Sequence, residues 1–158
     1  MTKSITLSDI AGYATERGVW QMMLDLSGGC DSGKLNNIGS QAVIITGSNF
    51  HLQNTEVSDN TSGRAFLAPE SFGNGTDKSK ASGIWTLGAL AFYAITGMHV
   101  FEGKGGETQT KDTVIPRLSS AHASRDLSEL IRRCLSYSPQ ARPTKEEIEQ
   151  KAQSALAQ

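Results

Sequence analysis

The sequence has 158 residues, 37% of them hydrophobic, which suits one globular domain with a buried core. Fifteen basic residues against sixteen acidic ones leave a formal net charge of −1, and no basic stripe follows the chain as nucleic-acid binding would require. The most apolar run, residues 84–98, is shorter than the ~20 residues of a membrane-spanning helix, and the charged N-terminal stretch is unlike a signal peptide. We therefore expect a cytoplasmic protein that binds neither nucleic acid nor membrane.

The cysteines and histidines predict no metal or redox centre. Cys30 and Cys134 stand far apart, and we expect both to be reduced thiols. His51, His99 and His122 have no partner at metal-ligand spacing. We expect the protein to hold no cofactor and no metal.

The first half of the chain predicts one helix and a small hairpin. Apolar residues recur at helical spacing within residues 19–26, which predicts a helix there. The short branched run at 42–45 predicts a strand, and residues 49–59 predict two very short strands around a polar turn. Residues 60–79 are rich in Gly, Ser, Asn and Asp and predict a loop.

The second half predicts a core helix followed by two peripheral helices. Residues 80–96 form an apolar stretch that predicts a helix buried on all sides, with Gly97 as its C-cap. Two amphipathic helices, at 125–135 and 143–158, are predicted to close the chain. The fold class predicted from this order is mainly α with a small β-hairpin.

Start signals accompany both closing helices. Asp126 with Glu129 has capping-box spacing in the first, and Thr144 with Glu147 has it in the second. We therefore expect Asp126 and Thr144 to begin these helices.

One motif suggests nucleotide binding but lacks its structural context. Gly28, Gly33 and Lys34 have the spacing of a phosphate-binding loop. The following hydroxyl that would bind magnesium is replaced by Leu35, and the preceding segment has helical rather than strand periodicity. We interpret Gly28 and Gly29 as lying in or near a helix end, where they permit close packing.

Three motifs together resemble the C-terminal lobe of a eukaryotic-type protein kinase. Ala68-Pro69-Glu70 resembles the end of the activation segment, and "GIWTLGALAFYAITGMHVFEG" resembles the central F helix and its exit. The sequence "LIRRCLSYSPQARPT" at 130–144 is similar to the loop between the last two helices. The resemblance implies a kinase C-lobe-like helical domain without the N-terminal lobe, a truncated pseudokinase.

The resemblance divides the single domain, residues 1–158, into kinase-like segments. Residues 1–18 match the hinge and the start of the D helix, 19–35 the E helix, and 41–59 a degenerate catalytic loop with a hairpin. Residues 60–79 match a short activation segment, 80–97 the F helix, and 124–157 the last two helices.

In the register that this division implies, the catalytic machinery is missing. The His-Arg-Asp positions fall on Ala42, Val43 and Ile44, so that an aliphatic Ile44 replaces the catalytic base. Asp-Phe-Gly is absent, and Asn49 and Asp59 are the weak remnants of magnesium binding. We expect no catalytic residue and no enzyme activity.

The resemblance also implies structural roles. Glu70 and Arg142 match a buried ion pair between the activation segment and the helical core, and Trp85 matches core packing at the start of the F helix. Both roles concern folding rather than chemistry.

We expect the domain to act in signalling as a scaffold or regulatory module that binds a protein partner. Because the N-terminal lobe is absent in this interpretation, an interaction face is expected at Val43, Ile44, Ile45 and Phe50. One alternative is residual nucleotide binding or kinase activity, completed by an N-terminal lobe supplied in trans. Another is a homodimer formed through the same uncovered face.

Overall fold

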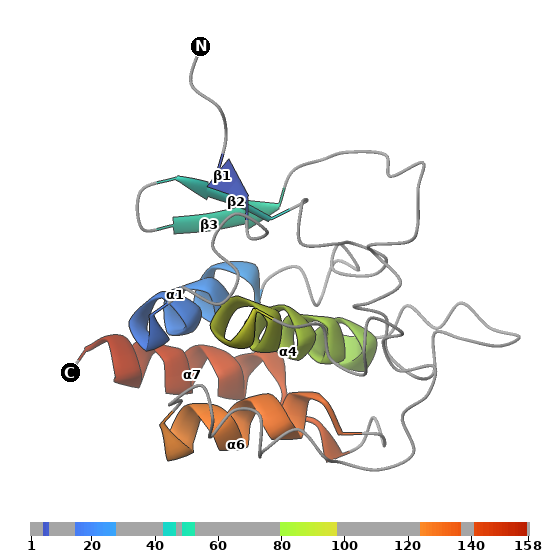
Figure 1. The fold of residues 1–158 in the computed structure, drawn as a ribbon. Coiled ribbons are helices and arrows are strands. Elements are labelled where there is room, and N and C mark those ends of the chain that lie inside the picture. Colours follow the sequence, from blue (N-terminus) through green and yellow to red (C-terminus); the bar gives the residue numbers. More distant parts are fainter. Residues whose placement is uncertain are drawn as a thin grey trace, which may run out of the picture.

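The computed structural model of the chain describes residues 5–6, 15–27, 43–46, 49–52, 80–97, 124–136 and 141–157. Within these ranges the chain forms three short strands and four helices (Figure 1). The elements are β1 (Ile5–Thr6), α1 (Glu16–Leu26), β2 (Val43–Thr46), β3 (Asn49–Leu52), α4 (Lys80–Thr96), α6 (Arg125–Cys134) and α7 (Lys145–Leu156).

The strands form one antiparallel sheet in the order β1-β2-β3. β2 pairs residue for residue with β3, so that Thr46 lies opposite Asn49 and Ile45 opposite Phe50. Only residues 47–48 separate the two strands, which makes them a tight hairpin. β3 covers the first of the two short strands expected within 49–59, but it pairs with the strand before it, and the turn expected within 49–59 lies outside the described residues. The sheet lies above α1 in Figure 1, and β3 contacts α1.

Helix α1 begins at a polar cap and buries one face. The Thr15 side chain accepts a hydrogen bond from the Gly18 N–H at 3.0 Å, which satisfies one of the free donors at the helix start. The buried face comprises Val19, Trp20, Met22, Met23 and Leu26. The helix therefore begins within the expected hinge segment, three residues before the predicted position 19, and it ends at Leu26.

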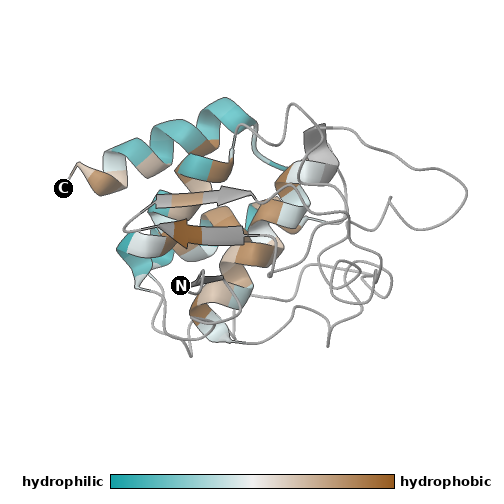
Figure 2. Cartoon of the chain, turned by 90° about the horizontal axis from the view of Figure 1, so that it is seen from above, coloured by the Kyte–Doolittle hydropathy of each residue, from teal (hydrophilic) through white to brown (hydrophobic). Residues whose placement is uncertain are grey.

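Helix α4 is the centre of the core. Its residues from Ile84 to Ile95 are almost all buried, and Trp85 has no exposed surface. Figure 2 shows the apolar colouring of this helix against the hydrophilic outer surface of α7. The helix ends at Gly97, whose φ of 76° lies in the left-handed region that glycine adopts without strain. The predicted span and its glycine cap are confirmed.

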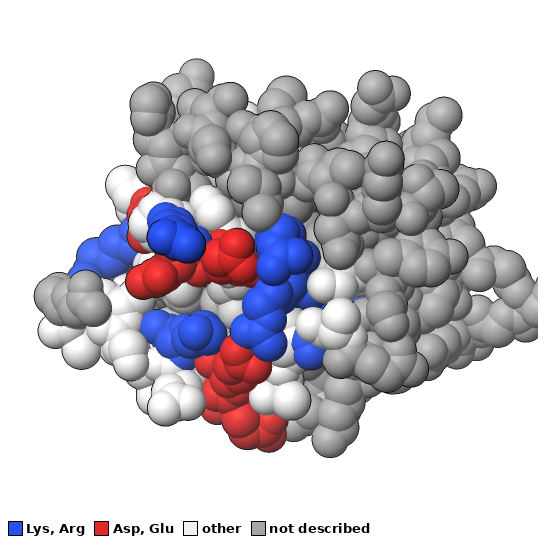
Figure 3. Space-filling model, turned by 90° about the horizontal axis from the view of Figure 1, so that it is seen from below, with Lys and Arg blue, Asp and Glu red and all other residues white. Residues whose placement is uncertain are grey.

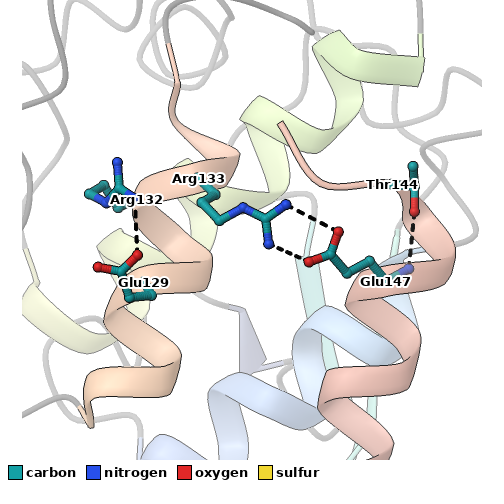
Figure 4. A network of polar contacts seen from close by, with 5 residues as sticks. All are labelled: Glu129, Arg132, Arg133, Thr144 and Glu147. Carbon is teal, nitrogen blue, oxygen red and sulfur yellow. Dashed lines mark hydrogen bonds and ion pairs between the residues drawn. The ribbon is translucent and has the colours of Figure 1, made fainter. Parts of the chain in front are cut away.

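The two closing helices begin at hydroxyl caps. The Thr144 hydroxyl accepts from the Glu147 N–H at 3.1 Å, as predicted (Figure 4). The cap of α6 is instead Ser124, whose hydroxyl accepts from the Leu127 N–H at 3.2 Å. The expected start at Asp126 was wrong because Asp126 already lies in the first helical turn, where its charge favours the helix dipole.

None of the described helices combines the length and apolarity needed to cross a membrane. The described core is one cluster of apolar side chains from α1, β3, α4, α6 and α7. The mainly helical fold with a small hairpin, as expected for a kinase C-lobe-like domain, is confirmed.

Candidate functional site

Three helix ends meet on one side of the molecule. The Glu16 carboxylate, at the start of α1, accepts a hydrogen bond from the backbone N–H of Ser124, the cap of α6, at 2.8 Å. The adjacent Arg17 donates from Nη2 to the carbonyl of Leu156 at the end of α7, at 3.0 Å. The first turn of α1 therefore joins the start of α6 to the end of α7.

A groove of about 840 Å³ lies at this junction. Sites for small ligands typically have volumes of ~300–1,000 Å³, so the groove is large enough to receive several side chains of a partner. Its described lining comes from α1, the start of α6 and one face of α7, and consists of Glu16, Arg17, Trp20, Ser124, Asp126, Glu147, Gln150, Lys151, Ser154 and Ala155. Figure 3 shows that basic and acidic side chains alternate on the described surface seen from below.

Two acidic side chains of the groove are already engaged by the protein. One oxygen of Glu16 accepts from Ser124, and the other accepts from the indole N–H of Trp20 at 3.4 Å. Both oxygens of Glu147 accept from the Arg133 guanidinium, which reaches across from α6 (Figure 4). These carboxylates therefore hold the walls of the groove together.

The pairing of Glu147 with Arg133 also sets its protonation. The hydrogen bond from Arg133 lowers the pKa of Glu147 below its usual value of 4.5, against the opposing effect of partial burial. The charges of Arg133 and of Lys151 lower this pKa further. Glu147 is therefore ionised at neutral pH.

The groove also contains two basic side chains. Arg17 and Lys151 are exposed, and neither forms an ion pair with any residue in the described ranges. Arg17 is held by the Leu156 carbonyl, where a cation is favoured by the C-terminal end of the helix dipole. The groove therefore presents two cations, Arg17 and Lys151, together with two carboxylates, Glu16 and Asp126, and none of these four forms an ion pair within the described ranges.

The structure changes the interpretation of the residues that were expected to form a catalytic loop. Val43 and Ile44, assigned to the positions of Arg and Asp, lie in strand β2 and pair with Leu52 and His51. A strand that turns back after two residues does not fit a catalytic loop running from Ile44 to Asn49. The strand predicted from the branched apolar run is correct, and the register that placed the base at Ile44 loses its support.

The expected interaction face is also revised. Phe50 is only 8% exposed and belongs to the core, and Ile45 packs against that core. The Phe50 N–H donates to Oδ2 of Asp25 on α1 at 2.8 Å, and Gln21 donates to the other oxygen of Asp25 at 2.8 Å. Ile45 and Phe50 thus attach the hairpin to the core rather than forming an exposed patch.

Of the remaining predicted site residues, the structure describes some and not others. Arg142 is buried, 6% exposed, and its Nε donates to the carbonyl of Ser136 at 2.9 Å. Trp85 lies in the core, while Asn49 pairs with Thr46 in the hairpin. Glu70 and Asp59 lie outside the described residues, as do the side chains of Val43 and Ile44 and the phosphate-loop-like segment 28–34.

Sequence reasoning did not find the groove. Its residues come from three segments, and the link between Glu16 and Ser124 joins positions 108 apart in the sequence. The only local signal is the polar spacing of Glu147, Lys151 and Ser154 along one face of α7, which is equally typical of a solvated helix. No group of three or more His, Cys, Asp or Glu in the described ranges is placed to hold a metal ion.

The helical core with its attached hairpin has the features of a kinase C-lobe. A comparison with protein-family models agrees with this fold, because the protein kinase domain model matches residues 41–153. The match covers most of the chain and includes β2, β3, α4, α6 and the larger part of α7. The chain belongs to the protein kinase domain family.

Proposed function

We propose that this chain is a non-catalytic member of the protein kinase domain family that acts by binding another protein. Phosphoryl transfer in kinases depends on an Asp and an Asn in the catalytic loop His-Arg-Asp-Leu-x-x-x-Asn and on the Asp of Asp-Phe-Gly. Neither His-Arg-Asp nor Asp-Phe-Gly occurs anywhere in the sequence. This support does not depend on how the chain is aligned with other kinases.

The observation that carries the proposal is the position of β2. In the kinase pattern that the chain resembles, a strand directly follows the Asn of the catalytic loop. If β2 is that strand, Ala42 takes the position of the Asn, and Asn37, five residues earlier, takes that of the catalytic Asp. A methyl group binds no magnesium, and a neutral amide does not accept the proton of a substrate hydroxyl.

Both registers therefore lead to the same expectation. With the base position at Ile44 or at Asn37, no carboxylate is available to act as the base. Because kinase catalysis consists almost entirely of positioned charge and metal, their loss removes the chemistry while leaving the helical core intact. A kinase-like fold that has lost phosphoryl transfer can still bind another protein, and the groove between α1, α6 and α7 is a surface for such binding.

The experiment that tests the absence of catalysis is a thermal shift with ATP and magnesium, together with a phosphotransfer assay on a generic substrate. We expect no change in Tm and no transfer, with an active protein kinase as the positive control. A rise in Tm that disappears in Asn49→Ala or Asp59→Ala would contradict the proposal and favour nucleotide binding at the remnant positions. Transfer above background would contradict it directly.

A further inference from the structure

We infer that α7 detaches from α1 as one unit while α1, α4 and α6 stay folded, so that the groove exists only while α7 is docked. This inference goes beyond the proposed binding role, because it concerns when the binding surface is present, and it does not require that catalysis be absent. Three features of α7 carry it: a small apolar contact with the core, polar contacts along the helix, and a large share of the groove lining.

The apolar contact between α7 and the core is small. Of the residues of α7, Ile148 and Ala152 are fully buried, while Ala155 and Leu156 pack against the core and stay partly exposed. Helix α1 buries a tryptophan, a valine, a leucine and two methionines, and α6 buries two leucines, an isoleucine and a cysteine. Because stabilisation by burial grows with the apolar area removed from water, α7 is held to the core more weakly than α1 or α6.

Polar contacts attach α7 near both of its ends. Near the start of the helix, Glu147 pairs with Arg133 of α6, and Glu149 accepts a hydrogen bond from the Ser27 hydroxyl at the end of α1, at 3.1 Å. At the other end, the Leu156 carbonyl accepts from the first turn of α1. Partly exposed contacts of this kind are screened by water, and each contributes little stability. They therefore fix the docked position of α7 without making its docking strong.

The remaining helices pack together without α7. Helix α4 contacts both α1 and α6, and β3 contacts α1, whereas the main contact of α7 is with α1 (Figure 1). The contacts of α4 stay in place when α7 leaves, so detachment is a local opening rather than unfolding. A helix of 12 residues is marginal by itself in water, and the amides of detached α7 therefore exchange with solvent.

Helix α7 also forms one wall of the groove. It supplies half of the described lining, and α1 with the start of α6 supplies the other half. When α7 leaves α1, this wall and the groove are lost. A ligand that contacts both walls binds only the docked form, so its binding and the docking of α7 favour each other. The docking of α7 thus controls whether the candidate binding surface is present.

The test is hydrogen exchange of the full chain, followed by NMR at increasing urea below the unfolding transition. After correction for intrinsic rates, the amides of Ile148 and Ala152 should exchange at least about tenfold faster than that of Leu90 in α4. Urea should accelerate exchange less in α7 than in α4, because detaching one helix exposes less surface than global unfolding.

Two neighbouring arginines of α6 provide matched variants. Arg133→Met removes the pair with Glu147 of α7, and Arg132→Met removes a pair with Glu129 of α6 itself. Arg133→Met should accelerate exchange at Ile148 about threefold to fivefold. Arg132→Met should leave this rate unchanged, since the pair with Glu129 persists when α7 is detached.

Ile84→Val tests whether α7 opens separately from the core. Ile84 is buried in α4, whose main contacts are with α1 and α6. Deleting a methylene there destabilises the whole fold against global unfolding, but it affects the docked and the detached forms of α7 alike. Exchange at Leu90 should therefore accelerate about threefold to tenfold, while Ile148 keeps its native rate.

Circular dichroism checks that each variant is folded. Three results would overturn the inference: the same protection and urea dependence at Ile148 and Leu90, equal acceleration of both amides by Ile84→Val, or an Arg132→Met effect on Ile148 as large as that of Arg133→Met. None of them bears on the assays with ATP and magnesium, so failure of the inference and failure of the proposed function are distinguishable.

Discussion

The Glu147 carboxylate accepts hydrogen bonds from two nitrogens of the Arg133 guanidinium, and this contact joins α7 to α6 (Figure 4). The two residues are 14 positions apart, so the pair joins two helices that are separate in the sequence. The same Glu147 begins α7 through its backbone N–H, which donates to the Thr144 hydroxyl. One residue thus serves both the start of its own helix and the attachment of its neighbour.

The ion pair should make a modest, pH-dependent contribution to stability. Both side chains remain about one-third exposed, at 34% and 32%, so water screens the pair. We expect Arg133→Met to lower the free energy of unfolding by about 1 kcal/mol at neutral pH. Urea denaturation of Arg133→Met, Glu147→Gln and the double variant would measure the coupling, and strictly additive losses would contradict a direct interaction.

The pH dependence follows from the lowered pKa of Glu147. Because Arg133 lowers this pKa in the folded chain below the 4.5 of the unfolded chain, the contribution is fully present above pH 4.5. It is lost as the pH falls through the lower folded pKa. The difference in unfolding free energy between the native chain and Glu147→Gln should therefore narrow below pH 4.5, and a difference that widens in acid would contradict this assignment.

Asp25 should control the attachment of the hairpin to the helical core. Its Oδ2 accepts from the Phe50 N–H, which points outward from β3 at an edge of the sheet. Asp25→Ala would leave this N–H without its acceptor, and we expect a loss of about 1–3 kcal/mol. Hydrogen exchange at the Phe50 amide should become faster.

Gln21→Ala is the control for Asp25, because it removes a donor to the other carboxylate oxygen and leaves the Phe50 hydrogen bond in place. Exchange at Phe50 should then stay near the native rate. Equal acceleration in both variants would indicate a general loosening of α1 rather than a specific contact.

The sequence was sufficient to predict those features that depend on local signals. Helix α4 has a long apolar run ended by a glycine, and Gly97 adopts the left-handed conformation that such an end requires. Thr144 begins α7 because its hydroxyl reaches an N–H only three residues ahead. These features involve neighbours in the sequence, so composition and spacing indicate them directly.

The site depended on contacts that the sequence does not encode locally. The groove exists because α1 lies against both the start of α6 and the end of α7, and no motif indicates this arrangement. The sequence could not fix the register of the hairpin against the kinase pattern, because strands of four residues carry too little pattern. The pairing of the two strands, such as Ile45 with Phe50, comes from the structure.

Gly88 should be essential for the close approach of α4 and α6. A Cβ at this position would lie 2.5 Å from the Cβ of Cys134 and 3.4 Å from Cγ of Leu135. Since the clash involves an atom fixed to the backbone of α6, Gly88→Ala requires the helices to separate. We expect a loss of about 2–3 kcal/mol, measured by urea denaturation.

Gly18→Ala is the matched control for Gly88. It is also a helical glycine, but within the described part of the chain its added Cβ would meet the Thr15 hydroxyl alone, at 3.2 Å. The gain in helix propensity of about 1 kcal/mol should offset most of this contact. If Gly88→Ala were as stable as Gly18→Ala, the packing of α4 against Cys134 would be looser than the structure indicates.

The predicted ion pair between Arg142 and Glu70 stays a prediction, and Arg142 supplies the reason to test it. Arg142 is 6% exposed, so its charge lies largely out of water, and the Ser136 carbonyl that accepts from Nε carries no net charge. If Glu70 is its counter-ion, Arg142→Ala and Glu70→Ala should each lower the free energy of unfolding by about 3–5 kcal/mol. The double variant should lose little more than either single one, since the charge left behind is then removed as well.

Arg142→Lys serves as the control for charge alone, because lysine keeps the positive charge but loses the planar set of donors. It should fall between the native chain and Arg142→Ala in a urea titration. Additive losses in the Glu70 and Arg142 variants would show that the two side chains do not interact. The buried Arg142 would then have another counter-ion.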